Sequence, residues 1–269
     1  MQLQDIEDFA IGVARGAGEL ILELRASTKL SREFKQGIEL VTDADLAADR
    51  YICKHINERF PGGLINPEDS APDIGRLEEI QQSFWIIDPI DGTVNFAHGH
   101  NQSAVSIAFV QNGNVVIGVV FNPFTDELFT ARKGGGAFLN SELIQVAEET
   151  RLERAIIATG FPYEKSNLEP MINRVRAVIT HCADIRRLGS AALDICWVAA
   201  GRLDGYYESL SIWDFAAARL IAQEAGATCG HFGEVPAGAD PQFYDQNLLI
   251  ANETLYPQLL TLLQQAQSQ

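Results

Sequence analysis

The chain has 269 residues, of which 46% are hydrophobic and 21% are charged, so it can bury a substantial core as one large domain or two smaller ones. This composition excludes a disordered or collagen-like chain. The formal net charge of -16 disfavours nucleic-acid binding, because no basic run offsets the repulsion of a polyanion.

Targeting and redox features predict a cytoplasmic protein. The chain begins with an acidic segment that lacks the basic start and apolar core of a signal peptide. No stretch approaches ~18 uninterrupted apolar residues, so we expect no membrane span. The four cysteines are scattered and form no C-x-x-C pair, which is typical of reduced, buried thiols in the cytosol.

Two helices are expected near the N-terminus. Apolar residues recur at helical spacing over residues ~4 to 26, which predicts an amphipathic helix. A second helix should follow Thr42, because Thr42 with Asp45 three residues later has the pattern of a capping box. That helix should run to about Phe60.

A strand-rich region comes next. Runs of apolar residues predict strands at 104–110, 115–121 and 127–131. Asn112-Gly113 is the expected hairpin turn between the first two strands. The region therefore predicts an antiparallel meander.

After Asn140 the pattern changes to alternating strands and helices, which predicts an α/β half. The expected elements are a strand at 155–158, a helix over ~168–180, a strand at 184–187, a helix from Ser190, a strand at 205–207 and a helix from Asp214. The Gln-rich end of the chain, residues 264–269, is expected to be a frayed terminus. We therefore divide the chain into an N-terminal α+β subdomain, residues 1–145, and a C-terminal α/β subdomain, residues 146–269.

Residues 85–96 have the outline of a metal and phosphate site. An apolar strand runs into a turn that contains Asp88, Asp91, Gly92 and Thr93 and precedes an expected helix. Hard cations such as Mg²⁺ prefer oxygen ligands and keep positions free for substrate phosphate oxygens. A helix N-terminus presents free amides to an anion. Asp-Pro and Asp-Gly are also ordinary turn residues, so this motif alone does not decide the matter.

Two further acidic clusters favour the interpretation as a site. Glu68 and Asp69 follow a short apolar stretch, and Asp214 stands at the expected N-cap of an apolar helix. Acidic clusters at three strand or helix ends suggest that they converge in the fold. A calcium-binding EF-hand loop is excluded, because its twelfth position counted from Asp88 is Gly99 rather than glutamate.

In these motifs the chain resembles the inositol monophosphatase family of Mg²⁺-dependent, lithium-sensitive phosphatases. The motifs are W-I-I-D-P-I-D-G-T-V-N-F from residue 85, W-D-F-A-A from 213, L-V-T-D-A-D from 40, E-D-S from 68 and G-S-A-A-L from 189. Several separated motifs in the family order are more specific than any one. The resemblance covers nearly the whole chain and implies that family's layered sandwich of helices and sheets, with an α+β N-terminal part and an α/β C-terminal part. It also implies a homodimer.

The resemblance implies two or three Mg²⁺ ions and assigns ligands to them. These ligands would be Glu68, Asp88, the backbone carbonyl of Ile90, Asp91 and Asp214. Catalytic roles fall to Glu68 and Thr93, which would orient the attacking water, and to Asp45, which would accept a hydrogen bond from Thr93.

The resemblance also implies a set of substrate contacts from both halves of the chain. They are Asp91, Gly92, Thr93, Arg186, Ala191, Glu208 and Asp214. Arg186 and its neighbour Arg187 are equally compatible with a solvated basic pair, and Glu208 with a surface carboxylate at a strand end.

The implied reaction is Mg²⁺-dependent hydrolysis of a small phosphate monoester by metal-activated water, without a phosphoenzyme. The expected substrate is myo-inositol 1-phosphate, and alternatives in the family are fructose 1,6-bisphosphate, a 3′-phosphorylated nucleotide and histidinol phosphate. An alternative of another class is a metal-binding interaction or regulatory protein without turnover. The expected partners are thus a small phosphorylated substrate and a second copy of the chain, and neither nucleic acid nor a membrane.

Three other polar features stay outside this site prediction. Lys35 resembles a residue of the mobile loop over the family's metal cleft, or is an exposed lysine. His98 and His100 lack further ligands at zinc spacing and are expected in a loop. Residues 133–136, Lys-Gly-Gly-Gly, lack the order of a phosphate-binding P-loop and should form a tight connection between strands. The chain departs from the family pattern at Asp69, which is one methylene shorter than the usual glutamate, and at Ala218, where glycine is usual.

Overall fold

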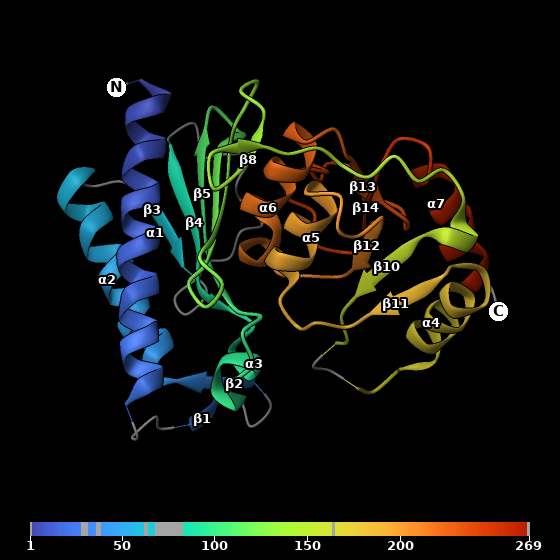
Figure 1. Ribbon diagram of the computed structural model, residues 1–269, viewed down its shortest axis with the longest axis horizontal. Helices are drawn as coiled ribbons and strands as arrows, with labels where there is room; N and C mark the ends of the chain where they lie inside the picture. Colours follow the sequence, from blue (N-terminus) through green and yellow to red (C-terminus); the bar gives the residue numbers. More distant parts are fainter. Residues whose placement is uncertain are drawn as a thin grey trace.

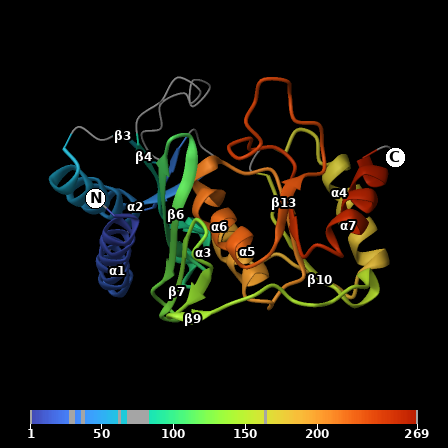
Figure 2. The ribbon, with the colours of Figure 1, turned by 90° about the horizontal axis from the view of Figure 1, so that it is seen from above.

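The chain folds into alternating layers of helices and sheets, shown in the computed structural model of Figure 1 and from above in Figure 2. The structure describes residues 2–27, 32–35, 39–61, 64–67, 83–162 and 165–267. Its helices are α1 (Leu3–Ala26), α2 (Asp43–Arg59), α3 (Thr93–His98), α4 (Glu169–His181), α5 (Ala191–Ala199), α6 (Ile212–Glu224) and α7 (Tyr256–Gln267), with a 3₁₀ turn at Leu152–Arg154. This architecture confirms the predicted layered sandwich.

The first sheet has seven strands in the order β3-β4-β5-β6-β7-β8-β9. They are β3 (Leu64–Pro67), β4 (Phe84–Asp91), β5 (Ala104–Gln111), β6 (Asn114–Asn122), β7 (Glu127–Arg132), β8 (Ala137–Leu139) and β9 (Glu142–Leu143). β3 and β4 are parallel, and every later pair is antiparallel. The predicted meander is therefore confirmed.

The turn between β5 and β6 is the predicted hairpin. Asn112 and Gly113 have φ angles of 52° and 70°. Positive φ at both central residues is the geometry of a type I′ turn, whose twist matches that of the flanking strands. A separate two-stranded sheet, β1 (Arg32–Lys35) with β2 (Glu39–Thr42), precedes α2.

α1 and α2 cover one face of the seven-stranded sheet (Figures 1 and 2). The predicted capping box at the start of α2 is present, since the Thr42 hydroxyl accepts a hydrogen bond from Ala44 N and the Asp45 carboxylate accepts one from Thr42 N. This capping satisfies amides of the first helical turn that have no partner inside the helix. It also buries the Asp45 carboxylate next to the end of β4.

α5 and α6 form the middle layer, between the two sheets (Figure 1). Both helices are apolar around most of their circumference, as expected of a helix that is packed on two sides. α6 lies so close to β6 that a Cβ on Gly118 would fall 2.5 Å from the carbonyl oxygen of Ala217. The fold also accommodates Ala218, which is fully buried.

The second sheet has five strands in the order β11-β10-β12-β14-β13. They are β10 (Ile156–Thr159), β11 (Asp184–Arg186), β12 (Gly205–Glu208), β13 (Thr228–His231) and β14 (Leu248–Ala251). β10 is parallel to β11 and β12, which confirms the predicted α/β pattern for these strands. β14 runs antiparallel to both β12 and β13. The sequence analysis did not anticipate β13 and β14.

α4 and α7 cover the outer face of this sheet (Figure 1). The expectation that residues 264–269 are frayed is wrong for its first part, because α7 continues to Gln267. Leu259, Leu263 and Ala266 are buried at helical spacing, and this apolar contact orders the end of the helix despite its glutamines. No described helix is long and apolar enough to cross a membrane.

Candidate metal and phosphate site

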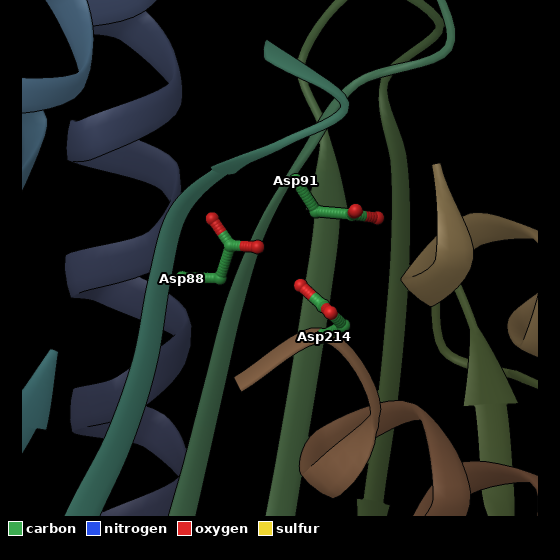
Figure 3. A group of neighbouring side chains, drawn as sticks. All are labelled: Asp88, Asp91 and Asp214. Atoms are coloured by element: carbon green, nitrogen blue, oxygen red, sulfur yellow. The ribbon is translucent and has the colours of Figure 1, made fainter. Parts of the chain in front are cut away.

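β4 brings Asp88 and Asp91 to the end of a fully buried strand. All of β4 is buried, and its pairing with β5 is irregular between these two aspartates. The Oδ1 of Asp88 accepts a hydrogen bond of 2.9 Å from Ile90 N. At this strand end the two side chains lie beside the start of α6 (Figure 3).

Asp214 reaches the same place from the first turn of α6. The sequence predicted it as the N-cap of α6, but the N-cap is Ser211 and Asp214 is the third helical residue. Its Oδ2 accepts a hydrogen bond of 2.9 Å from Ser211 N. This capping box fixes one carboxylate oxygen of Asp214 at the start of α6.

The carboxylates of Asp88, Asp91 and Asp214 form one cluster (Figure 3). One ligand oxygen from each lies within 4.8 Å of the others. Burial raises the pKa of Asp91 to about 6. Burial and the neighbouring charge of Asp91 hold the pKa of Asp214 well above its usual value. An oxygen-only donor set with this density of negative charge fits a hard divalent cation such as Mg²⁺.

The N-terminus of α5 holds Asp91 in position. The hydroxyl of Ser190 donates a short hydrogen bond to Asp91 Oδ2, and the amides of Ala191 and Ala192 donate to the same carboxylate at 3.3 and 2.8 Å. These bonds lower the pKa of Asp91 against the larger effect of burial. The start of α5 is thus occupied by a carboxylate of this chain.

Thr93 connects the carboxylate cluster to Asp45. Its hydroxyl lies 2.9 Å from Asp45 Oδ1 and 3.0 Å from the carbonyl oxygen of Ile90. The hydroxyl has one proton, so it donates to one of these oxygens at a time. The other oxygen of Asp45 accepts from Thr42 N at 2.8 Å, which fixes the orientation of the carboxylate.

Gly92 makes the turn that leads from β4 into α3. Its φ is 85°, in the left-handed region, and a Cβ there would lie 2.7 Å from the carbonyl oxygen of Gln102. Only glycine fits this position without displacing backbone. The Gly92 carbonyl oxygen also accepts a hydrogen bond of 3.0 Å from the Ser103 hydroxyl.

A cavity of about 240 Å³ opens beside the cluster. The predicted metal-binding residues among its walls are Asp88, Ile90, Asp91 and Asp214, and the remaining predicted substrate contacts there are Gly92, Thr93, Ala191 and Glu208. The fold therefore gathers residues from β4, α3, α5, β12 and α6 around one space. Asp45 does not line this cavity, but it accepts a hydrogen bond from Thr93, which does.

Glu208 forms a second acidic position in the cavity wall. Its carboxylate accepts a short hydrogen bond from the hydroxyl of Tyr206, and burial raises the pKa of Glu208 to about 7. A Cβ on Gly160, at the end of β10, would lie 2.0 Å from Glu208 Oε1. The absence of a side chain at Gly160 therefore makes room for this carboxylate.

The arginine in the cavity wall is Arg187. Its guanidinium carbon lies 5.4 Å from the centre of the Phe161 ring, and its charge lowers the pKa values of Asp91 and Glu208. Arg186, which was predicted to contact substrate, forms an ion pair of 2.5 Å with Asp184 and does not line this cavity. Arg186 is the last residue of β11 and Arg187 follows the strand, and of the two arginines only Arg187 lines the cavity.

Some predicted residues lie outside the described part of the structure, namely Glu68, Asp69 and the side chain of Lys35. The Lys-Gly-Gly-Gly segment is the predicted tight connection, between β7 and β8, and the amides of Gly134 and Gly136 donate to the carboxylate of Glu224 at 2.7 and 2.9 Å. This turn therefore binds an acidic side chain of α6.

Among the cavity residues that were absent from the predicted site are Gly160, Arg187, Ser190 and Asp194. Ser190 had been predicted as a helix start, but its bond to Asp91 depends on a contact across 99 residues. Asp194 carried a visible signal, since it is the one charged residue in the apolar helix A-A-L-D-I-C-W-V-A.

Comparison with known proteins matches this chain and its fold to a family of phosphatases. The model of the inositol monophosphatase family matches residues 2–268. "Nus factor SuhB" of Vibrio cholerae is 42% identical over 228 residues, which cover 84% of each chain. "Inositol monophosphatase 2" of Solanum lycopersicum is 40% identical and covers 83% of this chain and 86% of its own. The crystal structure of the extragenic suppressor protein suhB from Bartonella henselae superposes with a TM-score of 0.87 at 36% identity, covering 96% of this chain and 98% of that one.

The chain belongs to the inositol monophosphatase family. Its relatives carry two kinds of name, so membership alone leaves the activity open.

Proposed function

We propose that the protein is a Mg²⁺-dependent phosphomonoesterase that hydrolyses myo-inositol 1-phosphate to myo-inositol and phosphate. The observation that carries this proposal is the meeting of three carboxylates with the Thr93 hydroxyl at one cavity. Family membership supports the reaction class.

Asp88, Asp91 and Asp214 would hold the metal, and Glu68 and the carbonyl of Ile90 are further predicted ligands for two or three ions. When bound, Mg²⁺ supplies the positive charge that offsets the phosphate oxygens and makes water more acidic. The carboxylates would also determine where the positive charge of the metal lies relative to the cavity. The amides of Gly92 and Thr93 are the predicted contacts of the phosphate oxygens.

Thr93 orients the attacking water in this proposal. When its proton is donated to Asp45, the lone pairs of the hydroxyl oxygen are left to accept a hydrogen bond from water. The water proton then has an acceptor chain that ends at the buried carboxylate of Asp45. Attack by water needs no phosphoenzyme, and positioning is the main contribution of the protein to such a reaction.

The alcohol half of the substrate would lie toward Glu208 and Ala191, which line the same cavity. A carboxylate is a strong acceptor for the hydroxyl groups of a sugar alcohol. Arg187 takes the place first assigned to Arg186 as the cation beside the substrate.

Phosphate release from myo-inositol 1-phosphate tests the proposal. We expect turnover with millimolar Mg²⁺, loss of turnover in excess chelator, and inhibition by millimolar lithium. Full activity in chelator would refute the metal-dependent mechanism. A panel with fructose 1,6-bisphosphate, a 3′-phosphorylated nucleotide and histidinol phosphate, ranked by kcat/KM, decides between substrates of the same class.

A role without turnover is the second candidate, and the relatives named Nus factor favour testing it. The structure offers the variants for this test, because Asp91→Asn and Asp214→Asn each remove a carboxylate charge without changing side-chain volume. If a cellular role of the protein survives both changes while phosphatase activity is lost, that role is independent of catalysis.

We further propose a cytoplasmic homodimer. The four cysteines are all free thiols, which suits a reducing compartment. Light scattering after size-exclusion chromatography would give twice the chain mass of 29.5 kDa if the dimer forms.

A further inference from the structure

Asp194 is a buried acidic residue that the proposed reaction does not use. It lies in the first turns of α5, is 2% exposed and lines the cavity. Its Oδ1 has no hydrogen-bond partner among the residues that the structure describes. A buried carboxyl oxygen without a partner destabilises a fold. Asp194 is also the one charged residue of an otherwise apolar helix, so the presence of a carboxyl group calls for a functional reason.

Helix capping does not supply that reason. The amides of Ala191 and Ala192 donate to Asp91, the amide of Leu193 donates to the hydroxyl of Ser190, and the amide of Asp194 donates to the Ser190 carbonyl. The first turn of α5 is therefore satisfied without the Asp194 side chain.

Asp194 and Glu208 act on the same part of the cavity. Each of them lines it, and the charges of Asp91 and Glu208 add to burial in raising the pKa of Asp194. Gly160 leaves the space that Glu208 occupies. Among the described lining residues the cation is Arg187 alone, so this wall of two carboxyl groups has one positive charge beside it.

The chemistry of this wall selects among alcohols. A hydroxyl group both donates and accepts, so it satisfies a carboxyl group in either protonation state. A second phosphate would bring a further two negative charges against the wall, and an apolar group would leave the Asp194 oxygen unpaired. An uncharged polyol is the alcohol that meets both conditions.

We propose that Asp194 is a specificity-determining residue that binds a hydroxyl group of an uncharged polyol, beside the hydroxyl bound by Glu208. This inference rests on the proposed phosphatase function and narrows its substrate class. It distinguishes the sugar alcohol from the bisphosphate and nucleotide alternatives.

The test compares two ring phosphates with and without hydroxyl groups, myo-inositol 1-phosphate and cyclohexyl phosphate, at saturating Mg²⁺. For Asp194→Leu we expect kcat/KM on the inositol ester to fall by about tenfold or more, because hydrogen-bonded hydroxyls give discrimination of this size. On cyclohexyl phosphate we expect a change of no more than about twofold. The melting temperature of this variant should be unchanged or higher, since the unpaired oxygen is gone.

Two further variants separate specificity from structure. Asp194→Asn keeps the side-chain volume and hydrogen-bonding capacity, so it should lose less selectivity than Asp194→Leu, and it carries the test if the leucine variant does not fold. Cys196→Ala changes a buried residue of the same helix that does not line the cavity. It should lower the melting temperature and leave the ratio of the two kcat/KM values unchanged.

Three outcomes would overturn the inference. Equal losses on both esters would make Asp194 structural, and wild-type kcat/KM values on both esters in both Asp194 variants would remove it from specificity. A wild-type preference for a bisphosphate over the inositol ester would contradict the proposed binding of an uncharged polyol by Asp194 and Glu208. Failure of the wild-type protein to hydrolyse either ring phosphate is a different result, because it refutes the proposed function itself and the inference with it.

Discussion

α5 and α6 both begin at the cavity, and each holds a carboxylate at its N-terminus by a different route. In α6 the carboxylate is Asp214 of the same helix, bound to Ser211 three residues earlier. In α5 the carboxylate is Asp91, which comes from the end of β4 and binds Ser190 and two helix amides. One metal ligand is therefore fixed by local sequence, and the other by the docking of two distant segments.

The largest expected effect comes from removing either carboxylate charge. Asp91→Asn and Asp214→Asn should each lower kcat/KM for myo-inositol 1-phosphate by about 10³-fold or more, because each removes a charge that holds the metal. Steady-state kinetics over a range of Mg²⁺ concentrations measures both variants. We expect similar losses in the two variants, and near-wild-type turnover in either one would remove that residue from the site.

Substitution of the two N-cap serines should distinguish how the two carboxylates are held. Ser190→Ala and Ser211→Ala should each cost about 1 kcal/mol in the free energy of unfolding. Ser190→Ala should also raise the Mg²⁺ concentration needed for half-maximal activity by about tenfold, because Asp91 loses its hydroxyl partner. Denaturant melts and Mg²⁺ titrations check both values. An equal shift in the Mg²⁺ requirement of Ser211→Ala would contradict this difference, because Asp214 is bound by the backbone amide of Ser211 and not by its hydroxyl.

The pH dependence of stability reports the burial of these acids. Burial raises the pKa of Asp91 from 3.8 to about 6 and that of Glu208 from 4.5 to about 7. The folded state then binds more protons than the unfolded state, so the metal-free protein loses stability as pH rises from about 4 to 7. In chelator we expect a lower melting temperature at pH 8 than at pH 5.5. Added Mg²⁺ should stabilise more at pH 8, because protons compete with the metal for the carboxylates. A metal-free melting temperature that rises with pH would contradict the burial of the cluster.

The smallest effect concerns the other end of α6. Glu224 accepts hydrogen bonds from the turn amides of Gly134 and Gly136, away from the cavity. Glu224→Ala should cost about 1 to 3 kcal/mol of stability and leave kcat/KM unchanged. Thermal melts and kinetics measured on the same preparation would show this. A loss of activity at full stability would contradict this expectation, because it would mean that a change at the end of α6 alters the metal site at its start.

The sequence predicted well what local physics determines. The capping box of Thr42 and Asp45, the hairpin turn at Asn112-Gly113 and the meander all depend on neighbouring residues, and all are present. The convergence of Asp88, Asp91 and Asp214 was inferred from separated motifs together with a family resemblance, and the three carboxylates do meet. The division of the chain at residues 145 and 146 stays a prediction.

The sequence predicted less where long-range packing decides. The β13 and β14 strands, which pair antiparallel within an otherwise parallel pattern, and the ordered end of α7 depend on contacts across the second sheet. The choice between Arg186 and Arg187 depends on where β11 ends and on the path of the chain beyond it, which no local pattern shows. The bond between Ser190 and Asp91 joins residues that no local pattern relates.

The proposed function depends on a divalent metal site shared by Asp88, Asp91 and Asp214. The most direct measurement is anomalous diffraction from crystals soaked with Mn²⁺, which replaces Mg²⁺ at oxygen sites. We expect an anomalous peak in contact with oxygens of all three carboxylates, at about 2.1 Å from them. A peak bound elsewhere, or no peak at this cluster at saturating Mn²⁺, would contradict it.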